Sequence, residues 1–295
     1  MNIILGENAE SVEQNAAELL CERVSETGVN TASVFREGHA PEPHDGSLTV
    51  LLGRPDSHNR IRTYLDRKNI EAPNDFNPGA EGFLLMRSPD LGDGVVIAAG
   101  VDNRGVVYAV GEILRQMDCD DSGFSFPSDL YIRTAPAFEI RGTQFDQGGK
   151  MVKLTGVRRW TFEEQRRVIL DYMLAGANTF NVSIGLEPSD PLYRLFEDFD
   201  LNTLVHYSTN SGSGRPEWGA RESIGREGYL CPSIPEARKR LLEQCENRFK
   251  NSISFDYVRF PAGDGGGCEC DRCDPYGRTL MHLCEDYAHK NFNFW

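Results

Sequence analysis

The chain has 295 residues, of which 45 are acidic and 31 are basic, so its formal net charge is −14. This charge argues against partners such as nucleic acid or an anionic membrane surface, because both attract clustered Lys and Arg. A hydrophobic fraction of 39% is typical of a folded globular protein, and no apolar run is long enough for a membrane span. No signal peptide is recognisable in the given sequence, which leaves a cytoplasmic location or export with a signal not included.

The first 133 residues alternate between strand and helix signals. Apolar runs predict strands at 3–6, 48–53, 82–86 and 95–100, and helical spacing of apolar residues predicts helices at 12–24, 61–65 and 106–117. Ser11 is the expected N-cap of the first helix, and Gly28 is its expected C-terminal stop. A turn at 92–94 is expected to join the last two strands as a pair. These elements predict a small α/β sandwich.

Regular strand–helix units follow a stretch of Gly, Ser, Pro and acidic residues. That stretch, residues 118–137, has the composition of a linker, and we place the domain boundary between 133 and 134. Strands are then expected at 138–142, 178–182, 202–207 and 253–260, each followed by a helix, the last of them around 280–287. Four β/α units in series are typical of a (β/α)8 barrel or of a doubly wound sheet.

In either architecture, function resides in the loops after the carboxyl ends of the strands. The candidates expected there are Arg141, Asp146, Asn181, His206, Tyr207, Trp218 and Asp264. Carboxylates suit acid–base work on a glycosidic bond, and aromatic and polar groups suit a sugar. Five of these candidates also have a structural explanation: a helix cap for Asp146, a salt bridge for Arg141, core packing for His206, a domain interface for Trp218, and a tight turn around Asp264.

Three cysteines within six residues, Cys268, Cys270 and Cys273, are the densest chemical signal. Thiolates in such a group suit structural zinc or an iron–sulfur cluster, and zinc needs a fourth ligand. The candidates for it are Cys231, His206, His282 and Cys284. A local disulfide and free packed thiols remain alternatives. No other cofactor is expected, since the glycine run at 263–267 lacks the patterns of nucleotide-binding loops.

Residues 1–133 resemble the non-catalytic domain that precedes the barrel in family 20 β-N-acetylhexosaminidases and family 67 α-glucuronidases. The resemblance rests on the opening Ile-Ile-Leu-Gly-Glu-Asn-Ala, on the helix at 16–19, and above all on 100–108 through 114–116. Residues 136–142 are similar to the Arg-Gly strand that opens hexosaminidase barrels, which implies a sugar contact for Arg141. The catalytic Asp-Glu pair of that family reads Asp264-Gly265 here, so the resemblance carries over the Asp and not the general-acid Glu.

A closer resemblance is to an uncharacterised group of bacterial glycosidase-like proteins with the same amino-terminal domain. It rests on His206, on Pro-Glu-Trp at 216–218, on the Leu-Cys-x-Ser-x-Pro-Glu motif at 230–236, and on Asp264 before the cysteines at 268–273. That resemblance bears on the fold more than on the reaction. We expect a hydrolase that degrades a polysaccharide or glycan, with Asp264 and Asp146 as catalytic residues. A carbohydrate-binding protein without catalysis is the alternative, and a metal-stabilised structural domain is a third hypothesis. Glu269 is a further candidate for the general acid.

The second half is short for a complete barrel. A (β/α)8 barrel typically needs about 250 residues, whereas residues 134–295 supply four β/α units. We therefore expect about half of a barrel, truncated at an open sheet edge, with poor solubility and little activity for this chain alone. The sugar, the linkage, the stereochemistry and the oligomeric state are left open by the sequence.

Overall fold

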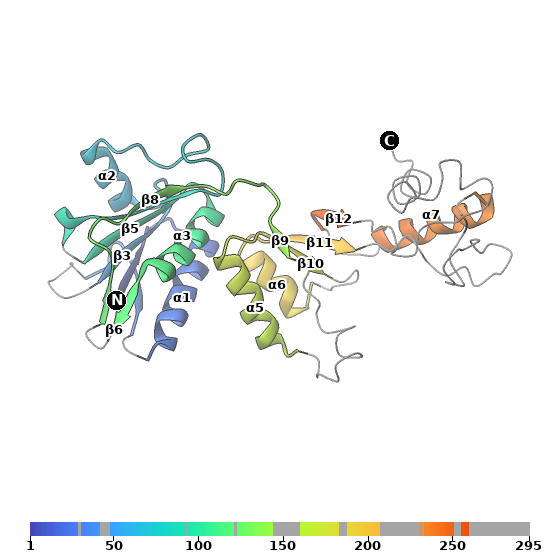
Figure 1. The fold of residues 1–295 in the computed structure, drawn as a ribbon, viewed down its shortest axis with the longest axis horizontal. Coiled ribbons are helices and arrows are strands. Elements are labelled where there is room, and N and C mark those ends of the chain that lie inside the picture. The colour runs from blue at the N-terminus through green and yellow to red at the C-terminus, as the bar shows by residue number, and fades with distance from the viewer. Residues whose placement is uncertain are drawn as a thin grey trace. The chain divides into compact units, whose positions relative to one another are not determined.

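The structure is a computed structural model (Figure 1). It describes residues 1–28, 31–41, 48–92, 94–120, 123–143, 160–182, 188–206, 231, 233–250 and 255–259. The chain divides into two compact units, the first formed by 1–180 and 191–201 and the second by 181–190 and 202–295. The boundary between 133 and 134 stays a prediction.

A six-stranded sheet with the order β2-β1-β3-β5-β4-β8 is the centre of the first unit. Its strands are β1 (Asn2–Leu5), β2 (Ser33–Arg36), β3 (Thr49–Gly53), β4 (Phe83–Arg87), β5 (Val95–Gly100) and β8 (Tyr131–Thr134). Strands β2, β1, β3 and β5 pair in parallel, and β4 pairs antiparallel with β5 and β8. The four expected strands and the expected antiparallel pair are therefore confirmed.

Helices cover both faces of this sheet (Figure 1). They are α1 (Ser11–Glu26), α2 (Asn59–Lys68) and α3 (Asn103–Gln116), with a short 3-10 turn η1 (Pro89–Leu91) before β5. Helix α2 packs Ile61, Tyr64 and Leu65 against sheet residues such as Leu51 and Ile97. Helices α1 and α3 lie against each other on the opposite face. One sheet with helices on both faces is the layered arrangement expected of the predicted α/β sandwich.

The helix ends follow local capping rules, with one correction. The N-cap of α1 is Glu10 rather than the expected Ser11, and the Glu13 side chain accepts a hydrogen bond from the Glu10 amide at 2.7 Å. Gly28 follows the C-cap with φ +70°, as expected for a helix stop. Asp102 caps α3 by accepting a bond from the Gly105 amide at 2.8 Å.

Four short elements continue the first unit or border it. They are β9 (Gly142–Thr143), α5 (Phe162–Leu174), β10 (Thr179–Val182) and α6 (Pro191–Asp198). Strand β9 is parallel to β10, with Gly142 opposite Thr179. The strand expected at 138–142 begins only at Gly142, because Phe138 is 75% exposed and has no core to enter. In α5, the buried face consists of Ile169, Leu170, Met173 and Leu174, and Tyr172 is exposed.

Helix α5 packs closely on α3 within the first unit. A Cβ atom at Gly111 of α3 would lie 2.0 Å from the carbonyl oxygen of Leu174, so only glycine permits this approach. The Arg115 side chain donates to the same oxygen at 2.8 Å. Residues on both sides of position 134 therefore contribute to one packed layer.

The second unit contains another parallel pair, β11 (Asn202–His206) and β12 (Tyr257–Arg259), with His206 opposite Arg259. Helix α7 (Pro235–Lys250) lies between them in the sequence. The Asp256 carboxylate accepts bonds from the amide and hydroxyl of Thr203, at 2.7 and 3.0 Å. This strand–helix–strand order fits the expected β/α units. A (β/α)8 barrel stays a prediction, and the helix expected at 280–287 lies outside the described residues.

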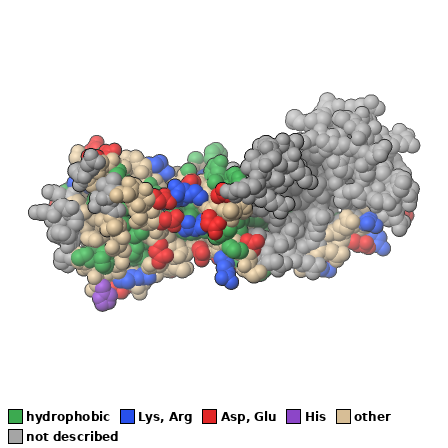
Figure 2. All heavy atoms as spheres, turned by 90° about the horizontal axis from the view of Figure 1, so that it is seen from below, with side chains coloured by type: hydrophobic (Ala, Val, Ile, Leu, Met, Phe, Trp, Pro, Cys, Tyr) green, Lys and Arg blue, Asp and Glu red, His purple; other side chains and the backbone are tan. Residues whose placement is uncertain are grey.

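Two small strands, β6 (Asp118–Asp120) and β7 (Gly123–Ser125), form a hairpin in the expected linker. On the face shown in Figure 2, basic and acidic side chains lie close to one another. Arg166 pairs with Glu22 and Arg23 with Asp171, both at 2.8 Å, so two ion pairs join α1 and α5. Within the described ranges, no helix is both long and apolar enough to cross a membrane.

Candidate functional site

The predicted site residues divide into those that the structure describes and those that it does not. Outside the described residues lie Asp146, Tyr207, Trp218, Asp264, Glu269, Cys268, Cys270, Cys273, His282 and Cys284. Arg141 and Asn181 are described with their side chains, and His206 is described through its backbone. The geometry of the site is therefore built from these three residues and their neighbours.

Asn181 and His206 lie near the carboxyl ends of neighbouring strands of one sheet. Asn181 is the penultimate residue of β10, and His206 is the last residue of β11. Both belong to the second unit. The carboxyl ends of parallel strands are where β/α proteins place their reactive groups. The described backbone thus puts two of the predicted residues at the edge where a site is expected.

The direction of the Asn181 side chain follows from the alternation along β10. Phe180 is buried and stacks on Phe196 of α6, with ring centroids 5.9 Å apart. Successive side chains of a strand point to opposite faces, so Asn181 points away from the face that Phe180 occupies. Helix α6 lies on the Phe180 face of β10, so the opposite face, toward which Asn181 points, is the one left for polar contacts.

The Asn181 side chain also has unsatisfied hydrogen-bonding capacity. Its Oδ1 atom is buried, and no residue in the described part of the chain donates a hydrogen bond to it. A buried acceptor without a donor costs about 1–3 kcal/mol, so it calls for a partner. A hydroxyl group is a donor of the right kind.

Arg141 lies in a different environment from Asn181 and His206. It precedes β9, at the amino end of that strand, and its guanidinium donates to the Gly176 carbonyl at 2.6 Å and to the Tyr108 hydroxyl at 2.8 Å. The same group pairs with Glu81 and lies 5.3 Å from the centre of the Tyr108 ring. These contacts fit the salt bridge considered from the sequence, and a sugar contact for Arg141 stays a prediction.

Glu81 is the acceptor at the centre of this network. Besides Arg141, it accepts from Arg104 at 2.8 Å and from the Asn178 amide at 3.1 Å. Burial would raise the pKa of Glu81, but the hydrogen bonds from Arg141, Arg104 and Asn178 outweigh it and hold the pKa below its usual range. A carboxylate kept ionised in this way is suited to holding cations in place and unsuited to donating a proton.

Glu81 is not among the residues that the sequence pattern indicates for a site. Its partners lie 23, 60 and 97 positions away along the chain, so no local motif contains them. A partial signal existed in Arg141 and Asn178, which both stand just before a strand. The contacts of such residues depend on which distant segments pack against the strand, and a local sequence pattern does not reveal those segments.

The metal hypothesis rests on residues outside the described ranges, apart from two candidates for the fourth ligand: Cys231 and, through its backbone alone, His206. Cys231 is buried, and its sulfur lies 3.0 Å from the Ser233 hydroxyl. In the ranges that the structure describes, no three His, Cys, Asp or Glu side chains gather in a metal-binding arrangement. Zinc at Cys268, Cys270 and Cys273 stays a prediction.

Sequence comparison finds no matching protein-family model and no matching curated protein. Structure comparison finds glycoside hydrolases. A family GH115 4-O-methyl-α-glucuronidase has a TM-score of 0.55 and 14% identity over 96% of this chain and 37% of its own length. The Flavobacterium johnsoniae chitobiase has a TM-score of 0.52 and 16% identity over 90% of this chain and 41% of its own.

A family GH20 exo-β-N-acetylglucosaminidase from Vibrio harveyi gives a similar result. Its TM-score is 0.52 at 12% identity, over 90% of this chain and 44% of the enzyme. The chain therefore spans less than half the length of these three enzymes. At such low identity the likeness extends to the fold alone: the chain has a glycoside-hydrolase-like α/β fold with a parallel-rich central sheet.

Proposed function

We propose that the protein carrying this chain is a glycoside hydrolase that cleaves glycosidic bonds of a polysaccharide or glycan, with a hexosaminidase-like or α-glucuronidase-like site. The observation that carries the proposal is the buried Oδ1 atom of Asn181, which has no donor among the described residues at the end of a β/α strand. The likeness of the fold to glycoside hydrolases supports the same choice.

In this proposal the carboxyl ends of the strands form the sugar site. Asn181 accepts a hydrogen bond from a substrate hydroxyl, and His206, Tyr207 and Trp218 complete the contacts to the sugar. Asp264 and Asp146 are the catalytic carboxylates, since a glycosidic bond is cleaved through a positively charged transition state flanked by two such groups. Asp264 stabilises that charge or orients the reacting group.

The test is the substitution Asp264→Asn in the protein that carries this chain. Hydrolysis of a panel of aryl glycosides is expected to fall about 100-fold or more, as is usual when an acid–base or charge-stabilising group is removed. Asp129→Asn is the matched control, because this carboxylate is exposed in the first unit. Unchanged turnover of the Asp264→Asn variant would contradict the assignment.

A second candidate function is carbohydrate binding without catalysis. It is favoured by one sequence observation: glycine, rather than a general-acid Glu, follows Asp264. In that case the same panel shows binding without hydrolysis in the unaltered protein. Binding without hydrolysis supports the second function over the first, and loss of that binding on Trp218→Ala, at a position outside the described residues, would assign it to the same site.

A further inference from the structure

The side chain of Asn178 joins the beginnings of β9 and β10. It is fully buried directly before β10, and its Oδ1 atom accepts bonds from the Arg141 amide at 2.9 Å and from the Thr179 hydroxyl at 2.8 Å. Its Nδ2 atom donates to the Glu139 carbonyl at 2.7 Å and to the Glu81 carboxylate at 3.1 Å. Two donors and two acceptors therefore surround this amide group, which is as many as it can use, and they hold it in one orientation.

Glu81, the partner that is remote in sequence, is linked to the beginning of a third strand as well. It pairs with Arg141, just before β9, and with Arg104 at 2.8 Å. Arg104 in turn pairs with Asp200 at 3.3 Å and donates to its carbonyl at 2.6 Å, in the turn that leads from α6 into β11. One carboxylate is thus connected, directly or through Arg104, to the residues before β9, β10 and β11, and all of these contacts lie within the first unit.

Glu81 is itself fixed to the elements around the six-stranded sheet. Its amide donates at 2.7 Å to Asp102, the N-cap of α3. A Cβ atom at Gly105 of α3 would lie 2.2 Å from the Gly82 carbonyl oxygen, so the helix packs closely on the segment that carries Glu81. Glu81 also has φ +57°, a conformation that glycine adopts more easily than glutamate does. A carboxylate at such a backbone position indicates that the side chain has a use there.

The same strands carry predicted site residues at their other ends. Asn181 of β10 lies three residues after Asn178, about 10 Å along the strand, and His206 is the last residue of β11. Phe180 is buried against Phe196, so the part of β10 between Asn178 and Asn181 is tightly packed and transmits a shift of its beginning. The place of the unpartnered Asn181 oxygen therefore depends on what fixes Asn178.

We propose that Glu81 is a positioning residue for the sugar site: it fixes the beginnings of β9, β10 and β11, and so sets the place at which Asn181 meets a sugar hydroxyl. This role rests on the proposed function, because Asn181 meets such a hydroxyl only if a sugar binds at the ends of these strands. It extends that function to the first unit, which contributes to the affinity for the substrate through the strands and without a contact to the sugar.

The test compares Glu81→Gln with Glu22→Gln in the protein that carries this chain, on the aryl glycosides that the unaltered protein hydrolyses. Glu81→Gln keeps the size of the side chain and removes the charge that holds Arg104 and Arg141. We expect KM to rise about tenfold, the usual value of one hydrogen bond, with kcat little changed, since a contact made equally in ground state and transition state affects KM. Glu22→Gln removes an ion pair to Arg166 of α5 and is expected to change neither constant.

A double-mutant cycle with Asn181→Ala separates positioning from a general loss of structure. Asn181→Ala removes the group that Glu81 is proposed to position, so the addition of Glu81→Gln is expected to raise KM no further, within about twofold. Partial unfolding would instead lower the apparent kcat and leave KM unchanged, because it reduces only the amount of active enzyme.

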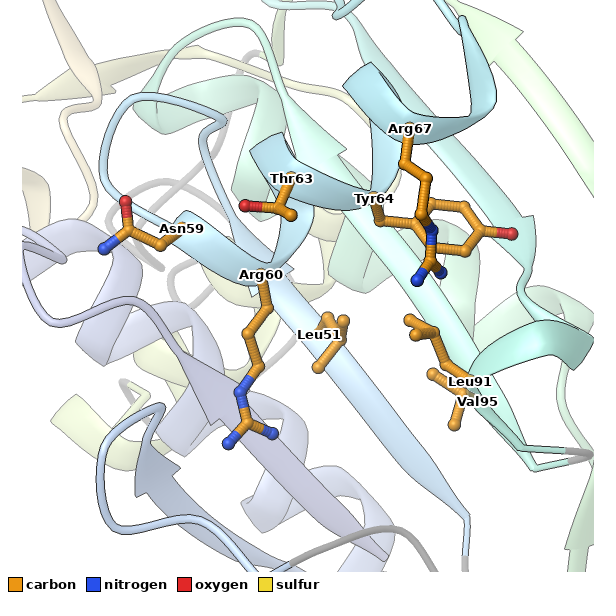
Figure 3. A pocket seen from close by; sticks show the side chains of 8 residues that line it. All are labelled: Leu51, Asn59, Arg60, Thr63, Tyr64, Arg67, Leu91 and Val95. Carbon is orange, nitrogen blue, oxygen red and sulfur yellow. The ribbon is translucent and has the colours of Figure 1, made fainter.

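Arg104→Gln keeps the proposal testable if Glu81→Gln does not fold, because it leaves the bond between Glu81 and Asn178 in place. It is expected to raise KM in the same direction by a smaller factor. Arg67→Gln is its control. Figure 3 shows Arg67 beside Tyr64 on α2, and this helix covers the face of the six-stranded sheet opposite to α3.

The outcomes separate this role from the function on which it rests. The role is overturned by an unchanged KM in the folded Glu81→Gln and Arg104→Gln variants, by an equal rise in Glu22→Gln, or by increases that multiply in the cycle. Each of these results leaves hydrolysis by the unaltered protein, and its loss in Asp264→Asn, intact as support for the proposed function. An unaltered protein that hydrolyses no glycoside overturns the proposed function, and the role of Glu81 with it. Thermal unfolding transitions above the assay temperature show which variants are folded.

Discussion

Glu81 holds side chains that the sequence separates widely. Its carboxylate is bound by Arg104, Arg141 and Asn178, and its own amide donates to Asp102 at 2.7 Å. Such a group contributes to stability through its partners as much as through itself, because its loss leaves buried donors without an acceptor.

Replacement of Glu81 by Ala is therefore expected to lower the free energy of unfolding of the first unit by about 2–3 kcal/mol. This is less than the loss expected for a fully buried ion pair, because Glu81 is partly exposed. Glu81→Gln keeps the shape without the charge and is expected to cost less. Urea unfolding followed by circular dichroism measures both changes. Glu71→Ala is the control, since that carboxylate is exposed, and an equal effect of Glu71→Ala and Glu81→Ala would contradict the role of the network.

Arg141 shows what sequence reasoning at single residues can and cannot supply. The sequence pattern places Arg141 at the carboxyl end of its strand, whereas it lies at the amino end of β9, and the pattern allows both a sugar contact and a salt bridge for it. The choice depends on Glu81 and Tyr108, which approach only when the chain has folded. The side of β10 on which Asn181 lies follows from alternation along one strand, which is a local property, and its contact with a sugar stays a prediction.

At the level of elements, apolar periodicity found the buried strands and missed the polar ones. Strands β1, β3, β4 and β5 consist almost entirely of buried residues. Strands β2 and β8 are half-exposed and lie at the edges of the sheet, so their sequences lack an apolar run. Edge strands are held by one neighbour and by the turns beside them, which is why pattern alone does not reveal them.

The start of α2 combines two features that affect stability at low pH. Glu37, at the end of β2, accepts bonds from the Arg60 and Asn59 amides at 3.0 and 3.3 Å, so it neutralises the helix N-terminus. His58 is fully buried, with Nδ1 3.1 Å from Glu37 and Nε2 3.1 Å from the Ile4 carbonyl. Burial lowers the pKa of His58 and outweighs the attraction of Glu37.

This arrangement predicts a loss of stability as the pH falls below about 6.5, the ordinary pKa of histidine. Above that pH His58 is neutral in both states. Below it the unfolded chain binds a proton that the folded chain resists, so unfolding is favoured until the lower folded pKa is reached. Unfolding midpoints between pH 7.5 and 5, the range that brackets this pKa, measure the effect.

His58→Gln is expected to reduce this slope, whatever it costs in stability at neutral pH. His39→Gln is the control, because His39 is exposed and is not one of the buried groups at the start of α2. A slope that is the same in the wild type and in His58→Gln would show that the buried histidine is not its source.

At the scale of the whole molecule, the sequence indicated a glycoside-hydrolase-like fold, and the structural comparison agrees to that extent. It could not indicate whether the second half forms a barrel, because that depends on strands that pair far apart along the chain. The proposed catalytic carboxylates, Asp146 and Asp264, are separated by more than a hundred residues, so no local pattern tells whether they meet.

The cysteines at 268–273 give a test on the same scale. If they hold structural zinc, protein purified under reducing conditions contains one zinc ion per chain, and Cys270→Ser and Cys273→Ser remove it. Cys119→Ser is the control, because Cys119 is an exposed thiol in β6. The absence of stoichiometric zinc or iron from the unaltered protein would exclude the metal hypothesis.

The close approach of α3 and α5 at Gly111 matters for protein engineering. A swap of amino-terminal domains between enzymes at position 134 would separate Gly111 from Leu174 and Glu81 from Arg141 and Asn178. The grafted piece would keep Gly111 on α3 but would lack α5, the helix that packs there. A chimera that carries residues 1–180 as one cassette preserves these contacts, so the natural unit of exchange is longer than the linker composition suggests.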